Sequence, residues 1–310
     1  MDTAPKEGNT GISWSDAGGG LAAMLVALPS ALAFGVAMYA PLGPGYTGAG
    51  ALAGVLGAVA LGLTAPALGG ASRLISAPCA PAAAVMAALC AQFAAGGAGP
   101  ETVIVMLALV ALMSGLLQAA YGALGGGRLI KYIPYPVVTG YMAGVGLLII
   151  LNQIVPFLGL AKNAVPLSGL LRPSVWQWPA VCVGAVTAAA ALLAQGRVRK
   201  VPAVILGLAA GLAAHLLLSA FVPGLLALKD NPLVIGAVST SPVAIMAAAG
   251  RNFAALRGLQ LSALPGLIYP ALTLSVLLSI DTLKTGVVTD VIVRSRHDSD
   301  QELRCQGAAN

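Results

Sequence analysis

Charged residues are scarce in this sequence. Only 8% of its 310 residues are charged, whereas 58% are hydrophobic and the mean hydropathy is +0.92. A soluble domain carries roughly 25% charged residues, because charge covers its outer surface. The scarcity therefore excludes a soluble globule of this size. Several apolar stretches reach about 20 residues, enough to cross a hydrocarbon core as helices. The sequence predicts an integral membrane protein surrounded by the lipid bilayer.

Patterns of metal sites and enzymes are also lacking. The four cysteines show no CxxC spacing, and the two histidines lie far from them, so neither a zinc site nor a disulfide framework is predicted. The sequence has no recognisable Ser/His/Asp arrangement, phosphate loop or carboxylate pair, which predicts no enzyme and no catalytic residue. His297, next to Asp298, is interpreted as a solvated loop residue. The polar, acid-containing N-terminus is not typical of a cleaved signal peptide.

Glycine and proline, by contrast, are abundant, with 39 and 20 residues. Small residues let membrane helices approach closely. Proline within or beside a span indicates a broken helix, which a membrane protein tolerates where the backbone is buried or lines a cavity. These features favour a transporter over a scaffold or a simple anchor.

Polar, Pro-rich and Gly-rich breaks divide the chain into eight candidate spans, the third of them short and the eighth long enough to bend. They are Ala17–Met38, Tyr46–Pro66, Ala77–Ala94, Thr102–Leu124, Pro136–Pro156, Val175–Ala194, Pro202–Phe221 and Leu264–Ile292. Between the last two, a short interfacial helix is predicted around Pro242–Phe253.

Lys and Arg in the connections predict the orientation. With the N-terminus in the cytoplasm, ten of these residues lie in inner segments and five in outer segments, with Lys284 set apart inside a span. This bias follows the positive-inside rule and accounts for the net charge of +6 without a nucleic-acid partner.

The run RLISAPCAPAAAV, from Arg73 to Val85, has the composition of a helix start. Ser76 is expected to cap a helix whose first turn holds Pro78 and Pro81. If this start lies at mid-depth in the membrane, its free amides and positive dipole end form an anion site. An ordinary capped helix at the membrane surface is the alternative.

The first span carries a proline in its interior. Pro29 removes one backbone hydrogen bond, Ser30 follows it, and Phe34 lies one turn later on the same face. Such a helix borders a substrate cavity or is simply kinked for packing.

Asp281 and Lys284 lie inside the eighth, otherwise apolar, span. Charged residues are costly in a membrane and indicate function. Two arrangements fit the spacing. Asp281 and Thr285 share a helix face and could coordinate a cation, or Asp281 and Lys284 could neutralise each other. Asp290, near the end of the span, is interpreted as a solvated interface residue.

These three regions, in this order, resemble the sulfate permease (SulP) family, which is solute carrier family 26 in animals. LPSALAF, from Leu28 to Phe34, resembles the family's LPQALAF pattern, and SRLISAPCAP, from Ser72, resembles SRQLSVGP. RHDSDQELRCQGAAN, at the end of the chain, is similar to the family's RHDSNQELIGQGIGN, a long and specific match.

The resemblance implies an all-α polytopic membrane protein with two inverted repeats of seven segments, which usually dimerises and carries a cytoplasmic STAS domain. It assigns residues 1–16 to a cytoplasmic tail, 17–124 and 264–292 to core segments 1–4 and 8, and 125–222 to gate segments 5–7. Residues 223–263 become an extracellular or interfacial connection and 293–310 a cytoplasmic loop. On this basis the chain stops before segment 9, which predicts a truncated and inactive fragment.

The resemblance also implies site residues. Ser30 and Phe34 would line the anion site from the first segment, and Ser76, Ala77, Pro78 and Cys79 would present the third helix start. Asp281 and Thr285 would hold the coupling ion, sodium or a proton, and no other cofactor or metal is expected. The implied function is secondary transport of sulfate, bicarbonate or a dicarboxylate, by symport or anion exchange.

Departures from the family pattern bear on that function. Ser30 replaces the usual Gln, Ala77 replaces a Gly, and Lys284 stands where many members have Leu. The charge of Lys284 suggests anion exchange or proton coupling in place of sodium symport. A nucleobase permease of the related fold and a truncated membrane module that does not transport are the alternative functions.

Overall fold

The computed structural model describes residues 14–71, 74–132, 135–160, 169–195, 197, 201–227, 231, 234, 241–259 and 264–310. Within these ranges every regular element is a helix. The α-helices are α1 (Trp14–Tyr39), α2 (Thr47–Ala67), α3 (Ala80–Ala95), α4 (Pro100–Ala123), α5 (Tyr135–Leu158), α7 (Trp178–Ala194), α8 (Ala203–Ser219), α9 (Pro242–Gly258), α10 (Pro265–Val293) and α11 (Ser299–Ala309). Short 3-10 helices are η1 (Ala40–Leu42), η2 (Pro44–Tyr46), η3 (Gly126–Tyr132) and η4 (Pro173–Val175).

The all-helical prediction is confirmed, and each of the eight candidate spans is found as a helix. Among the described residues, four helical stretches are long and apolar enough to cross a membrane: Ala17–Leu42, Pro44–Ala67, Pro100–Ala123 and Pro265–Val293. Helices α3, α7 and α8 are apolar but shorter, with 16 or 17 residues. The predicted interfacial helix is α9, which extends to Gly258.

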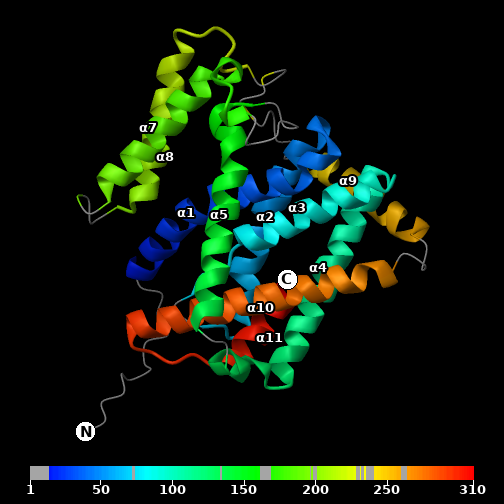
Figure 1. Ribbon diagram of the computed structural model, residues 1–310. Coiled ribbons are helices and arrows are strands. Elements are labelled where there is room, and N and C mark those ends of the chain that lie inside the picture. Colours follow the sequence, from blue (N-terminus) through cyan, green and yellow to red (C-terminus); the bar gives the residue numbers. More distant parts are fainter. Residues whose placement is uncertain are drawn as a thin grey trace.

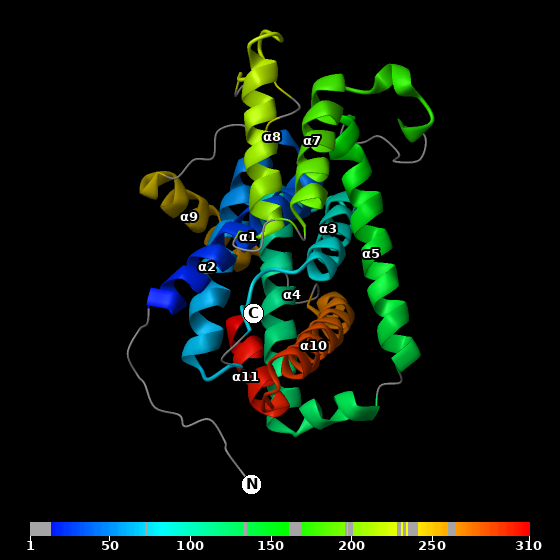
Figure 2. The same ribbon diagram turned by 90° about the vertical axis from the view of Figure 1, so that its left-hand side faces the viewer.

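The helices form two groups (Figures 1 and 2). In the first, α1 packs along α2, and α4 packs against α10 and α11, with α3 between α1 and α4. In the second, α7 and α8 form an antiparallel pair beside α5 and stand apart from α10 and α11. Large exposed hydrophobic side chains, such as Leu116, Leu217 and Val291, occur in both groups. Apolar surface of this extent fits contact with lipid.

The buried core lies where α3, α4 and α10 meet the end of α1. Its members are Tyr39, Met86, Leu89, Cys90, Val103, Leu107, Val110, Leu267, Ala271 and Leu274. The backbones of helices α1 and α2 are in direct contact. A Cβ placed on Gly35 would lie 2.1 Å from the carbonyl oxygen of Gly50. Only glycine permits this approach, so the small residues of these spans have a packing role.

The prediction that residues 293–310 form a loop is wrong. Ser299–Ala309 is helix α11, capped by Asp298, whose carboxylate accepts the N–H groups of Asp300 and Gln301. The helix packs against α4 and α2, and five of its residues are buried. The hydropathy of this segment is as low as that of a loop because Asp300 and Glu302 are polar. Both side chains are nevertheless buried, and each accepts a hydrogen bond from a backbone N–H group of another segment.

Candidate functional site

An extended segment, Leu74 to Cys79, leads into α3. The helix begins after Cys79, which has extended dihedral angles, and Pro81 lies in its first turn. The first N–H groups of any helix lack intrahelical partners and carry the positive end of its dipole. The start of α3 therefore has the free backbone donors that an anion site would need.

Ser76, however, does not cap this helix. The N-cap residue is Cys79, no side-chain cap hydrogen bond forms, and Pro78 precedes the helix instead of lying in its first turn. The Ser76 hydroxyl is buried and accepts a hydrogen bond from the side-chain amide of Gln306 in α11. The partner of Ser76 thus comes from 230 residues further along the chain.

A cavity of about 440 Å³ lies beside this segment. Ser76 and Ala77 form one wall, and residues of α1 and α2 form the others, among them Ala27 and Leu28. Leu28 directly precedes Pro29, which lies inside a continuous α1. Ser30 is exposed and its hydroxyl donates to the Val26 carbonyl, 3.3 Å away, while Phe34 is half-buried. The cavity lies between the segment before α3 and the turn of α1 just before these two residues.

Asp281 and Lys284 form an ion pair in α10. Lys284 Nζ lies 2.9 Å from Asp281 Oδ1, and the two side chains are 12% and 23% exposed. The hydroxyl of Thr285 donates to the backbone carbonyl of Asp281 at 2.8 Å. The spacing allowed either a cation site at Asp281 and Thr285 or an ion pair between Asp281 and Lys284. The structure contains the ion pair.

The α3 start and the ion pair adjoin one another. Helix α3 packs against α10, and the thiol of Cys79, the N-cap residue of α3, lies near the Asp281 carboxylate. A helix start, a carboxylate and an ammonium group therefore lie together inside the membrane domain. The positive end of α3 and Lys284 outweigh the single negative charge of Asp281, so this region favours an anion.

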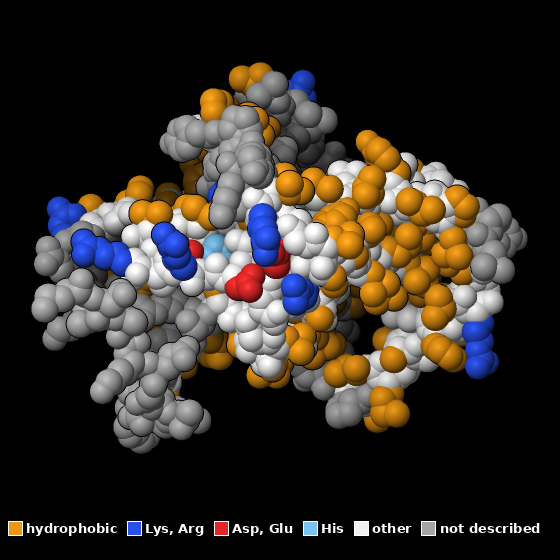
Figure 3. All heavy atoms as spheres, turned by 90° about the horizontal axis from the view of Figure 1, so that it is seen from below, with side chains coloured by type: hydrophobic (Ala, Val, Ile, Leu, Met, Phe, Trp, Pro, Cys, Tyr) orange, Lys and Arg blue, Asp and Glu red, His pale blue; other side chains and the backbone are white. Residues whose placement is uncertain are grey.

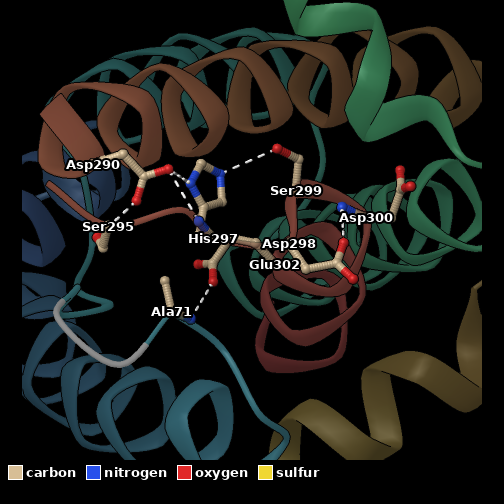
Figure 4. Close-up of polar contacts among 8 residues, drawn as sticks. All are labelled: Ala71, Asp290, Ser295, His297, Asp298, Ser299, Asp300 and Glu302. Atoms are coloured by element: carbon tan, nitrogen blue, oxygen red, sulfur yellow. Dashed lines mark hydrogen bonds and ion pairs between the residues drawn. The ribbon is translucent and has the colours of Figure 1, made fainter. Parts of the chain in front are cut away.

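The structure also assembles a cluster that the sequence did not predict. His297 Nδ1 lies 2.7 Å from Asp290 Oδ2, and its Nε2 lies 3.2 Å from the Ser299 hydroxyl (Figure 4). The His297 side chain is only 6% exposed, and Asp290 also accepts from the His297 N–H and the Ser295 hydroxyl. The interpretation of His297 as a solvated loop residue is wrong, because the chain turns back after Arg294, whose φ is +53°, and folds His297 onto α10. Asp290 keeps 21% of its side chain exposed.

This Asp/His/Ser arrangement joins the end of α10 to the first turn of α11 (Figure 4). Helical spacing could not predict it, because the three residues lie in two helices and the connection between them. Neighbouring Asp300 accepts the Gly127 N–H at 2.8 Å and lies 3.4 Å from Arg128. These contacts tie η3, which follows α4, to the first turn of α11.

A model of the sulfate permease family matches residues 14–310. The chain belongs to the sulfate permease family. Members of this family are transporters and not enzymes. We therefore interpret the Asp290–His297–Ser299 contacts as those of a transporter and not as a catalytic triad.

Two bicarbonate transporters, both called BicA, are among its relatives. The chain is 33% identical over 304 residues to BicA of a Picosynechococcus species, covering 94% of this chain and 48% of that protein. It is 32% identical over 274 residues to BicA of a Synechocystis species, covering 84% of this chain and 44% of that protein. A putative sulfate transporter of Bacillus subtilis, YvdB, is 26% identical over 217 residues, or 66% of this chain and 37% of that protein.

The fold is similar to that of a bicarbonate transporter of known structure. The transmembrane domain of a cyanobacterial BicA superposes with a TM-score of 0.70 at 30% identity, covering 94% of this chain and 69% of that one. The chain spans about half the length of the two BicA proteins that it matches. An integral, multi-pass membrane protein follows from the family and the apolar helices.

Proposed function

We propose that this chain forms part of a secondary active transporter that moves bicarbonate across the bacterial cytoplasmic membrane by alternating access. The observation that carries the proposal is the meeting of the α3 start with the Asp281–Lys284 pair. Two relatives named as bicarbonate transporters favour bicarbonate as the first substrate to test, with sulfate second. Ser30, Phe34, Ser76, Ala77, Pro78 and Cys79 are the proposed substrate-binding residues.

The α3 start would bind the anion through backbone N–H groups, which suit oxyanions of several shapes. Bicarbonate and sulfate present the same acceptor oxygens, so the site chemistry accommodates both. Lys284 adds a positive charge nearby, while the apolar walls of the 440 Å³ cavity exclude much of the water that would compete. In this arrangement the core helices would carry the anion relative to α5, α7 and α8.

Coupling would depend on Asp281. A carboxylate in an apolar span needs a positive partner, and the Lys284 ammonium supplies one at 2.9 Å. A sodium ion at Asp281 and Thr285 would have to displace this ammonium. We therefore propose anion exchange or proton coupling, with sodium-independent uptake.

Topology is part of the same proposal. Arg128, Arg296 and Arg304 lie where α4 and α10 end and α11 packs, and the view of that side shows charged side chains gathered over its middle (Figure 3). By the positive-inside rule this end faces the cytoplasm, as would the N-terminus. A homodimer is the proposed assembly.

Uptake in liposomes tests the function, with this chain reconstituted together with the rest of the transporter of which it forms part. We expect accumulation of radiolabelled bicarbonate above that of empty liposomes, equal in sodium and in choline buffers, with sulfate as a competitor. Uptake of sulfate alone would move the substrate to sulfate, and uptake of uracil alone would support the nucleobase alternative. Absence of uptake for all three would overturn the proposal for this chain and leave a module that does not transport.

A further inference from the structure

A line of hydrogen bonds runs from α11 to Ser76 at the candidate anion site. The Gln306 side-chain nitrogen contacts both the Ser76 hydroxyl and Glu302 Oε1, the latter at 2.9 Å. Glu302 Oε2 in turn accepts the Ala71 N–H at 2.6 Å (Figure 4). The three side chains thus link α11 to the loop between α2 and α3 at two points.

Glu302 is 2% exposed, although a buried carboxylate is costly unless its oxygens are satisfied. Both oxygens accept here, one from the Ala71 backbone and one from the Gln306 amide, so the contacts found within the described ranges come from neutral donors. Both contacts need an acceptor at position 302, and a carboxylate offers one at each oxygen. A glutamine of the same shape would keep one acceptor and place an NH₂ group opposite one of the two donors.

The donor and acceptor roles of these groups determine the direction of each hydrogen bond in this line. An ionised carboxylate only accepts hydrogen bonds, so the end of the Gln306 amide that faces Glu302 is the NH₂ group. The second N–H of the same nitrogen then donates to Ser76, whose oxygen is the acceptor. Because a hydroxyl both accepts and donates, the O–H of Ser76 remains available for another acceptor.

We propose that Glu302 and Gln306 are positioning residues, which hold the Ser76 hydroxyl as a hydrogen-bond donor toward an oxyanion in the transport site. This inference rests on the proposed function, in which Ser76 contacts the substrate. With Gln at position 302 the Gln306 amide can turn over and present its oxygen. Ser76 would then donate to that oxygen, and the donor facing the anion would be lost.

Concentration-dependent bicarbonate uptake by the same reconstituted transporter in liposomes tests the proposal. Glu302→Gln is expected to raise KM about tenfold with little change in maximal rate, since one hydrogen bond to a charged ligand is lost. Ser76→Ala should raise KM by a similar factor. Adding Glu302→Gln to Ser76→Ala should then raise KM no further, because the hydroxyl that Glu302 directs is absent.

Gln301→Ala is the matched control. Gln301 lies in the same helix and donates to the Leu68 carbonyl at 2.8 Å, so its loss loosens the same loop without altering the contacts of Ser76. We expect its KM to equal that of the unmodified chain. If Glu302→Gln does not yield folded protein, Gln306→Leu removes the same donor and should show the same dependence on Ser76.

The outcomes separate the two proposals. An unchanged KM in Glu302→Gln, or an equal rise with and without the Ser76 hydroxyl, overturns the positioning role while uptake by the unmodified chain upholds the transport function. A KM rise in Gln301→Ala as large as that in Glu302→Gln would show that loop packing, and not the direction of the Ser76 hydroxyl, is responsible. No uptake by the unmodified chain would overturn the transport function itself.

Discussion

Lys284 Nζ lies 2.9 Å from Asp281 Oδ1, one turn apart on α10 and next to the start of α3. Both charges lie in a helix of 29 residues that is otherwise apolar over most of its length. Each side chain therefore gives the other an oppositely charged partner, which the apolar interior of the membrane does not provide. Four predictions follow from this pair and from three other contacts.

Removing the ammonium should change the ion dependence of uptake. In Lys284→Leu the Asp281 carboxylate loses its counter-ion, so it must take up a cation or a proton. We expect bicarbonate uptake that is equal in sodium and choline buffers before the substitution to become at least about fivefold faster in sodium or at low pH, a shift of roughly 1 kcal/mol. Lys284→Arg, which keeps the charge, is the control. An unchanged ion dependence in Lys284→Leu would refute the role of this pair in coupling.

The contact between α1 and α2 should not tolerate a methyl group at Gly35. A Cβ there would meet the Gly50 carbonyl oxygen at 2.1 Å, which is backbone and cannot rotate away. We expect Gly35→Ala to destabilise the protein by about 1–3 kcal/mol, the usual cost of overpacking. Thermal melting in detergent measures the effect. Gly57→Ala is the matched control in the same helix pair, since a Cβ at Gly57 meets nothing within 4 Å; equal melting of the two variants would contradict the packing.

The start of α11 should depend on Asp298 in a pH-dependent way. The Gln301 N–H foremost, and that of Asp300, bind the Asp298 carboxylate and lower its pKa from the usual 3.8. A lowered pKa means that the cap stabilises α11 above pH 3.8 and that this stability is lost as the pH falls through the lowered value. Asp298→Ala should cost about 1 kcal/mol at pH 7.

The same variant series provides the check on that prediction. Between neutral pH and a pH below the lowered pKa, the melting difference between the unmodified chain and Asp298→Ala should shrink. Asn at position 298 caps without titrating, so the melting temperature of Asp298→Asn should stay above that of Asp298→Ala at both values. A difference that is constant with pH for the unmodified chain would show that the carboxylate does not cap α11 through its charge.

Cys305 should be protected from alkylation in the folded protein. Its side chain is 1% exposed and its thiol donates to the Leu68 carbonyl at 3.0 Å. Burial, and then the nearby Glu302 carboxylate, raise the pKa of this thiol, so little thiolate is present at neutral pH. N-ethylmaleimide should modify Cys305 at least about tenfold faster in denatured than in native protein, as mass spectrometry of digests would detect. Equal rates in native and denatured protein would contradict the burial of α11.

Much of the fold was predictable because membrane helices are encoded locally. The spans beginning near Ala17, Tyr46, Thr102 and Leu264 all appear as helices within a few residues of the expected bounds. Apolar length, proline breaks and the cost of exposed backbone in lipid act on each segment by itself. The motifs at Leu28–Phe34 and after Ser72 likewise identified the family, now supported by a match over residues 14–310.

The contacts of the candidate site were only partly predictable. Helical spacing gave the Asp281–Lys284 pair as one of two arrangements, because i and i+3 positions share a face whatever the fold. The partner of Ser76 could not be found in this way. Gln306 lies 230 residues away from Ser76 in the sequence. Cys79, and not Ser76, occupies the N-cap position of α3.

The sequence by itself determined that this protein is helical, lies in a membrane and carries a charged pair in one span, since hydropathy and helical spacing are local properties. Only the tertiary structure decided the place of residues 293–310. Their polar side chains make them resemble a solvated loop, yet Asp300, Glu302 and Gln306 find donors and acceptors on η3 and the loop before α3. Whether a polar residue faces water or a buried partner depends on segments far away in the chain, and no local pattern contains that information.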